Sequence, residues 1–457
     1  MNRILPAAAI LALHLTGACA TSPSIVESLS PGGTEFVLAR VPGADHLVIQ
    51  VAWPTDWAVN TGINHAAPIL AMRSQFLGGA EGFEPGALKV QLNDAGAEAY
   101  LTLDSQFIYG TIVLPREGAE DVLAAINVHL RAPRFDELWF RRVRDEYMNH
   151  LEESLRKPQA LTFDTTRWLT FGDHIYLRSQ SFEGSLDAVR TVKRFDLVSW
   201  ARATYSSAPQ AFIVAGDIDA GTAGRLVDIL LRGLPGNPPS PASLPIGAPD
   251  AGSVLIHVPH ARDSYVTISG AIPVPAEWPK IHDGFIVSTL SRSDGGLLHD
   301  AVRDSLRATY SIEADYGEIH YNSHFLAIHG SVDTSRVNEY VEAILQTYGE
   351  FVESPSLKGL DQYLASMEES LERRRNHPVS LSLSVLRAVL RGIDVSGIPD
   401  RLASAERFSA DVIRGRVRNA YPSTDELLIV VASPDSGVLP GACVIETPEE
   451  VLECDLN

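Results

Sequence analysis

The chain has 457 residues, of which 45% are hydrophobic and 21% are charged, and its formal net charge is −20 at pH 7. This is the composition of a globular protein of roughly two to four domains, with enough apolar residues for large cores. The excess of acidic residues argues against nucleic acid, or an anionic membrane surface, as the main partner.

The chain begins with an export signal. The stretch MNRILPAAAILALHLTGACATS has an early arginine, then an apolar run that ends in small residues; residues 1–20 are therefore predicted to be a secretory signal peptide. Its LTGAC sequence resembles a bacterial lipoprotein signal with Cys19 as the lipidated residue, although Thr16 stands where that signal prefers Leu. Cleavage after Ala20 is the alternative, and it would leave a free periplasmic protein. No other segment is long and apolar enough to span a bilayer.

Residues 60–72, NTGINHAAPILAM, are typical of a helix start. Zinc peptidases of the inverted type carry H-x-x-E-H on such a helix. His65 matches the first histidine, but Pro68 and Ile69 stand in place of the glutamate and the second histidine. Isoleucine has no lone pair for a metal, and proline can neither bind a proton nor sit deep in a helix. The stretch is therefore a degenerate zinc motif or a helix with an unrelated histidine.

Strands then alternate with helices, which predicts an α+β fold with helices packed on mixed or antiparallel sheets. The first series comprises a strand at 107–115, a helix at 120–131, a helix at 135–157 capped by Asp136 and ended before Pro158, and a buried strand within 208–219. The second series comprises a strand at 325–333, helices at 337–351 and 360–375, and a strand within 425–435.

The two series belong to an internal repeat. Three segments of the first part have counterparts in the same order and at nearly constant separation: 41–57 with 258–274, 95–104 with 306–315, and 150–157 with 366–373. Two homologous α/β sandwich-like domains in tandem are therefore expected. The predicted organisation is a signal peptide at 1–20, an N-terminal domain at 28–235, a Pro-rich linker at 236–252, a C-terminal domain at 253–440 and a tail at 441–457.

Two cysteines remain beyond the signal, Cys443 and Cys454. A local disulfide between them is expected, because the compartment permits disulfides. The alternative is two free thiols in a loose tail.

Nearly the whole mature chain resembles the pitrilysin/insulinase-type zinc metallopeptidase family, in its short two-domain bacterial form. Residues 61–72 lie where that family has its H-x-x-E-H helix, and residues 178–219 resemble the end of its first domain. Residues 295–314, GGLLHDAVRDSLRATYSIEA, resemble its second-domain signature, in which an Arg and a Tyr seven residues apart help to bind substrate. Arg303 and Tyr310 match that pair.

The resemblance also implies how a zinc site would be built. Two histidines and a distant glutamate bind the metal, and a further glutamate activates the bound water. Glu146 follows Ile69 with 76 residues between them, which is the family's spacing for the third ligand. With Pro68 and Ile69 in the motif, only the remnants His65 and Glu146 are left, so no zinc is expected in this chain.

Other interpretations of these residues remain open. Glu146 is equally explained as a solvated helix carboxylate paired with His150, and Glu153 is a rival third ligand. A rearranged metal site would use His65 and Glu146 with His150 or His174. Arg303 could equally be a surface charge on an amphipathic helix.

The resemblance implies a noncatalytic subunit of a secreted zinc peptidase, inactive on its own, that pairs with an active homologue holding the zinc. Arg303 would hold a carbonyl or carboxylate of the substrate, and Tyr310 would hydrogen-bond a carbonyl oxygen or developing oxyanion. Unfolded peptides would bind in extended form by addition to a strand edge. The alternative is an inactive homologue that binds peptides or assists assembly without a role in proteolysis, as relatives in respiratory complexes do.

Overall fold

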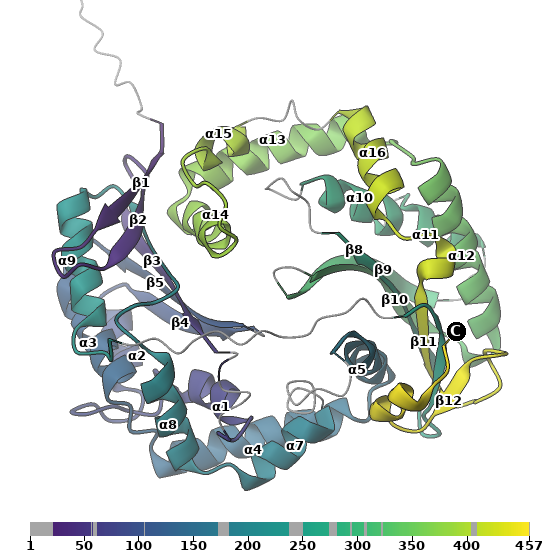
Figure 1. Cartoon of the computed structure of the whole chain (residues 1–457), viewed down its shortest axis with the longest axis horizontal. Coiled ribbons are helices and arrows are strands. Elements are labelled where there is room, and N and C mark those ends of the chain that lie inside the picture. Colours follow the sequence, from purple (N-terminus) through teal and green to yellow (C-terminus); the bar gives the residue numbers. More distant parts are fainter. Residues whose placement is uncertain are drawn as a thin grey trace, which may run out of the picture.

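The computed structural model describes residues 22–55, 57, 62–104, 106–171, 182–236, 250–273, 281–292, 295–305, 309–320, 323–403 and 409–456. The predicted signal peptide with Cys19 lies outside the described residues, as does most of the Pro-rich linker. The α+β class is confirmed: two mixed six-stranded sheets are each covered by helices (Figure 1). No helix in the described part of the chain combines the length and the apolar character that a membrane span requires.

The first half of the chain builds the first sheet. Its strands are β1 Ser24–Leu29, β2 Glu35–Arg40, β3 His46–Pro54, β4 Glu98–Leu103, β5 Phe107–Pro115 and β6 Ala211–Gly216. Its helices are α1 Ala67–Ser74, α2 Ala87–Asp94, α3 Ala119–Arg131, α4 Glu137–Ser154, α5 Pro158–Phe171, α7 Phe182–Thr191, α8 Arg194–Thr204 and α9 Ala220–Leu231.

The second half builds the second sheet. Its strands are β7 Gly252–His257, β8 Ser264–Ile272, β9 Thr309–His320, β10 Ser323–Val332, β11 Leu428–Ser433 and β12 Cys443–Ile445. Its α-helices are α10 Ile281–Ser291, α11 Leu297–His299, α12 Val337–Glu353, α13 Leu360–Asn376, α14 Pro378–Leu390, α15 Ile398–Ala403 and α16 Ala410–Ala420. The second half also contains a π-helix, η2 Asp300–Ser305, and a 3-10 helix, η5 Pro448–Glu453.

The two sheets share one strand order, β1-β2-β6-β3-β5-β4 and β12-β7-β11-β8-β10-β9. The segments matched in sequence fall on corresponding elements, namely β3 and β8, β4 and β9, and α4 and α13. β4 and β9 each form one edge of a sheet, so each has only one strand neighbour. The opposite edges differ in origin, because β1 comes from the start of the half that it joins and β12 from the end.

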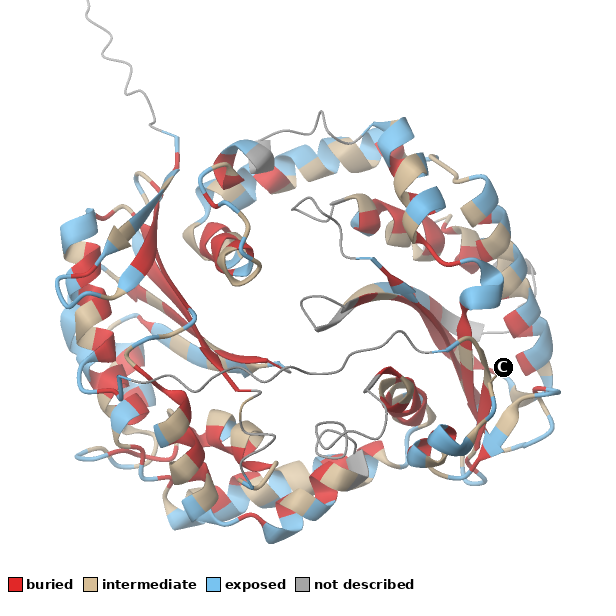
Figure 2. Cartoon of the chain, viewed as in Figure 1, coloured by how far each residue is buried: buried red, intermediate tan, exposed pale blue. Residues whose placement is uncertain are grey.

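The outer face of each sheet carries a large apolar core. Alternate residues of β3, including Leu47, Ile49 and Trp53, pack under the helices of the first half. In the second half, Ile268 and Ile328 pack under helices that include α12. Figure 2 shows buried residues concentrated in the strands and on the helix faces turned toward them. The hydrophobic effect acting on these alternating side chains fixes which face of each strand is turned outward.

The inner faces are covered by exchanged helices. α14, from the second half, packs on β2, β3 and β6 of the first sheet, whereas α5, from the first half, packs on β8 and β11 of the second. Leu381 joins Val48 and Ile213 in one inner core, and Leu161 joins Ile256 and Val430 in the other. Figure 1 shows each of these helices lying against the inner face of the sheet that it covers. The two halves are therefore interlocked.

Strand pairing extends beyond the predicted domain boundaries at both ends. The first half begins at Ser24, ahead of the predicted residue 28, because β1 pairs with β2 along its whole length. In the predicted tail, β12 pairs in parallel with β7 and η5 packs against α5. Cys443 and Cys454 form a disulfide with their Cα atoms 5.9 Å apart.

Candidate functional site

The segment predicted to be a degenerate zinc motif lies at the start of α1. The helix begins at Ala67 with Pro68 in its first turn, where the missing proline N–H costs no hydrogen bond. His65 therefore lies in the turn before the helix rather than on it. Ile69 packs against the core of the first half. Pro68 thus forms part of the helix start and Ile69 packs against the core, and neither side chain can act as a base or a metal ligand.

The turn that carries His65 is held by α7. The side chain of Asn64 donates to the carbonyl of Ala188 at 2.9 Å and accepts from the backbone N–H of Ala66, also at 2.9 Å. His65 is half-buried, and burial lowers the pKa of its imidazole. A neutral imidazole could ligate a metal, so the defect of the motif lies in the missing partners.

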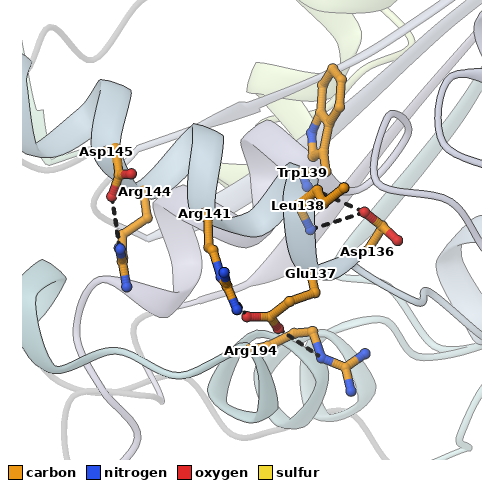
Figure 3. Close-up of polar contacts among 8 residues, drawn as sticks. All are labelled: Asp136, Glu137, Leu138, Trp139, Arg141, Arg144, Asp145 and Arg194. Atoms are coloured by element: carbon orange, nitrogen blue, oxygen red, sulfur yellow. Dashed lines mark hydrogen bonds and ion pairs between the residues drawn. The ribbon is translucent and has the colours of Figure 1, made fainter.

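Glu146 lies on the exposed face of α4, the helix that packs beside α1. Figure 3 shows how this helix begins: Asp136 accepts from the backbone N–H groups of Leu138 and Trp139, which confirms the predicted cap. A row of ion pairs follows, among them Glu137–Arg141 at 2.9 Å and Arg144–Asp145 at 2.8 Å. This is the character of a solvated helix face.

Glu146 has the same character. Its side chain is 57% exposed and pairs with Arg142 at 2.8 Å, so the expected partner His150 was wrong: that ring stacks near Tyr147 instead. The rival Glu153 is also exposed and pairs with Lys157. Between α1 and α4 the contact includes the guanidinium of Arg73, 4.9 Å from the centre of the Tyr147 ring.

A group of side chains with the spacing of metal ligands lies in the second half of the chain. Over the part of the chain that the structure describes, the only group of three or more His, Cys, Asp or Glu side chains close enough to share an ion is Glu313, Asp315 and His329. His65, Glu146 and His150 do not form such a group, and His174 lies outside the described residues. The rearranged site at α1 therefore gains no support.

Arg303 and Tyr310, the predicted substrate-binding pair, lie shortly before Glu313 in the sequence. Arg303 belongs to the π-helix η2, and Tyr310 lies near the start of the edge strand β9. The side chains of both residues lie outside the described part of the structure, so their roles in substrate binding stay predictions.

An open strand edge lies beside the degenerate motif. Among the residues that the structure describes, β4 pairs only with β5, and it contacts α1. Its residues alternate between exposed and half-exposed, and the Tyr100 side chain is 46% exposed. The unpaired backbone groups of such an edge can pair with another extended chain.

Residues 191–367 match the sequence model of the peptidase M16 inactive domain. The fold matches a crystal structure of the peptidase M16 inactive domain from Pseudomonas fluorescens, with a TM-score of 0.77 and 13% identity over 90% of this chain and 98% of that one. The sequence match thus covers residues 191–367, and the fold match covers most of the chain. This confirms the pitrilysin/insulinase-type resemblance and supports a noncatalytic member.

Two other solved structures share the M16 fold of this chain. A protease from Helicobacter pylori matches with a TM-score of 0.72 and 11% identity, over 91% of this chain and 100% of that one. The periplasmic protease PqqL from Escherichia coli matches with a TM-score of 0.64 and 13% identity, over 94% of this chain but only 50% of that one. At such identities the likeness concerns the fold alone. No curated protein matches the chain in sequence.

Sequence reasoning missed the Glu313, Asp315 and His329 group. Its signal was present, because two carboxylates two residues apart in a strand point to one face. The histidine, however, lies on the neighbouring strand, and only the β9–β10 register sets it opposite Glu313.

Proposed function

We propose that this M16 protein is a noncatalytic subunit of a zinc peptidase in the bacterial cell envelope. It would bind unfolded peptide and pair with an active homologue that carries an intact H-x-x-E-H motif and holds the zinc. Arg303 and Tyr310 would complete the partner's site. Export rests on the predicted signal peptide, and the periplasmic location of the structural relative PqqL is in keeping with it.

One observation carries the proposal. The helix α1 lies beside α4 and β4, with Pro68 in its first turn and Ile69 against the core. By the sequence resemblance, these are the positions of the catalytic base and the second metal ligand. The chain therefore retains the framework for an extended peptide and lacks the groups that would activate water at zinc. A subunit that binds substrate without cleaving it has these properties.

An extended peptide would add to β4 as a further strand. Main-chain hydrogen bonds would supply most of the affinity, and the alternating side chains of the edge would supply the selectivity. Peptides methylated on alternate backbone nitrogens lose these donors on one edge. We expect them to compete poorly for binding, whereas peptides methylated at the other register compete normally.

Hydrolysis of a quenched fluorescent peptide library tests the shared site. The purified chain, the active homologue and their mixture would be compared, with zinc content assayed in each. We expect cleavage above that of the homologue alone only in the mixture. Tyr310→Phe should lower kcat roughly 100-fold, the usual effect of removing one oxyanion donor, and Arg303→Ala should lower it as well. Arg414→Ala, at an exposed arginine paired with Asp411 on α16, is the matched control.

The other results point elsewhere. A silent mixture that still binds peptide would favour a binding or assembly module with no part in proteolysis. Cleavage by the lone chain would show that Pro68 and Ile69 do not abolish catalysis.

A further inference from the structure

We propose that Glu313, Asp315 and His329 form a second-half binding site for a divalent cation of the zinc class. This site is separate from the degenerate motif at α1, and it does not depend on the proposed function. It lies on the inner face of the second sheet, where α5 of the first half packs.

The sheet brings the three side chains together. In the antiparallel pairing of β9 with β10, His329 stands directly opposite Glu313, and Asp315 is paired with the next inward-facing position, Ala327. Side chains alternate along a strand, so all three project from one face. Their ligand atoms lie within 4.8 Å of one another, and Nε2 of His329 is 2.8 Å from a carboxylate oxygen of Asp315.

His329 is held in one orientation. It is only 5% exposed, and its Nδ1 is 2.8 Å from the hydroxyl of Tyr265 on β8. The ring of Phe163, from α5, meets the imidazole edge to face with 5.2 Å between ring centres. Nε2 is thereby directed at the two carboxylates. A histidine whose far nitrogen is fixed by a hydrogen bond is the usual arrangement of a metal ligand.

The hydrogen bonds of His329 are compatible with the protonation state that metal binding requires. With a cation on Nε2, Nδ1 would carry the proton and donate it to the oxygen of Tyr265. That hydroxyl is also hydrogen-bonded to the side chain of Gln159 of α5, whose amide oxygen can accept the tyrosine proton. The network therefore accepts a cation without leaving a buried donor unpaired.

The ligand set indicates which cation fits. One imidazole nitrogen and two carboxylates match zinc, with a fourth position left for water or another ligand. Glu313 and Asp315 are exposed, the latter with 63% of its side chain, so an ion has access from solvent. The buried histidine supplies the rigid part of the site and the exposed carboxylates supply the charge.

Zinc titration of the untagged, chelator-treated chain tests the proposal. Isothermal titration calorimetry should give one zinc per chain, and Co²⁺ in its place should give a visible absorption band. His329→Ala, or Glu313→Gln with Asp315→Asn, should abolish both signals. Tyr265→Phe should keep the ligands and weaken zinc binding roughly 10- to 100-fold, as loss of a partner behind a ligand does.

Two control variants separate this site from others. His257 forms a similar histidine–carboxylate contact with Glu446 in the same sheet, at 3.3 Å, and His65 is the remnant at α1. His257→Asn and His65→Asn should bind zinc as the native chain does. Circular dichroism confirms that each variant is folded. Absence of zinc binding, or zinc retained by folded His329→Ala, would overturn the proposal.

Discussion

Shortening Leu381 to Ala should loosen the sheet of the other half of the molecule. Leu381 belongs to α14 in the second half, but it is fully buried against strands of the first sheet. Its truncation removes packing from β3 and β6 and leaves a cavity that the rigid sheet cannot close. Leu383, two residues further along the same helix, is 38% exposed and provides a matched control.

The magnitude follows from burial. Truncating a fully buried leucine costs about 3 to 5 kcal/mol, as the sum of lost transfer free energy and the cavity term. The same change at an exposed site costs about 0.5 kcal/mol or less, and leucine and alanine are both good helix formers. A difference of about 3 kcal/mol corresponds to more than 100-fold in an opening equilibrium.

Hydrogen–deuterium exchange locates the effect. Leu381→Ala should speed exchange of the β3 and β6 amides by about 100-fold, whereas Leu383→Ala should leave them close to native. The reciprocal change, Leu161→Ala in α5, should act on β8 and β11 of the second sheet. If Leu381→Ala altered only α13 and α14, the reasoning that the two halves stabilise each other through exchanged helices would be refuted.

Two further predictions concern stability. The Cys443–Cys454 disulfide closes a loop with a sequence separation of 11, so the double serine variant should lose about 3 kcal/mol by the chain-entropy relation; equal urea midpoints with and without the bond would contradict this. His129 is fully buried, its Nε2 lacks a partner among the described residues, and burial lowers its pKa below the ordinary value of 6.5. The unfolded chain therefore binds a proton at His129 more readily than the folded chain does. The contribution of neutral His129 to the free energy of unfolding is fully present above about pH 6.5 and is lost as the pH falls through the folded-state pKa. His129→Gln should flatten that decline in the free energy of unfolding, and an unchanged pH slope would exclude His129 as its source.

Pro68 and Ile69 both fit the local structure of α1. Pro68 is compatible with α1 because it stands in the first turn, and Ile69 faces the core. A histidine at position 69 would have to leave that core, and a glutamate at position 68 would restore only one group. Recovery of a zinc site at α1 therefore requires both changes together with a third ligand, since Glu146 is exposed and paired with Arg142.

The sequence by itself determined the elements whose signals are local. The strand predicted at 107–115 is β5 with the same bounds, the Asp136 cap begins α4, and proline punctuation separates α4 from α5. It was also visible that positions 68 and 69 hold a proline and an isoleucine, neither of which can bind a metal, because this is a matter of residue chemistry alone. Periodicity, capping and side-chain identity act over a few residues and can be read from them.

The tertiary structure alone decided what depends on contacts between distant segments. No local sequence pattern predicts that α5 packs on the second sheet and α14 on the first. An apolar helix face can pack against any apolar sheet face. The same holds for β12, which lies in the segment predicted to be a tail. The Glu313, Asp315 and His329 group exists only because strand register places two segments side by side. Register is set by long-range pairing and core packing, and these are properties of the folded chain.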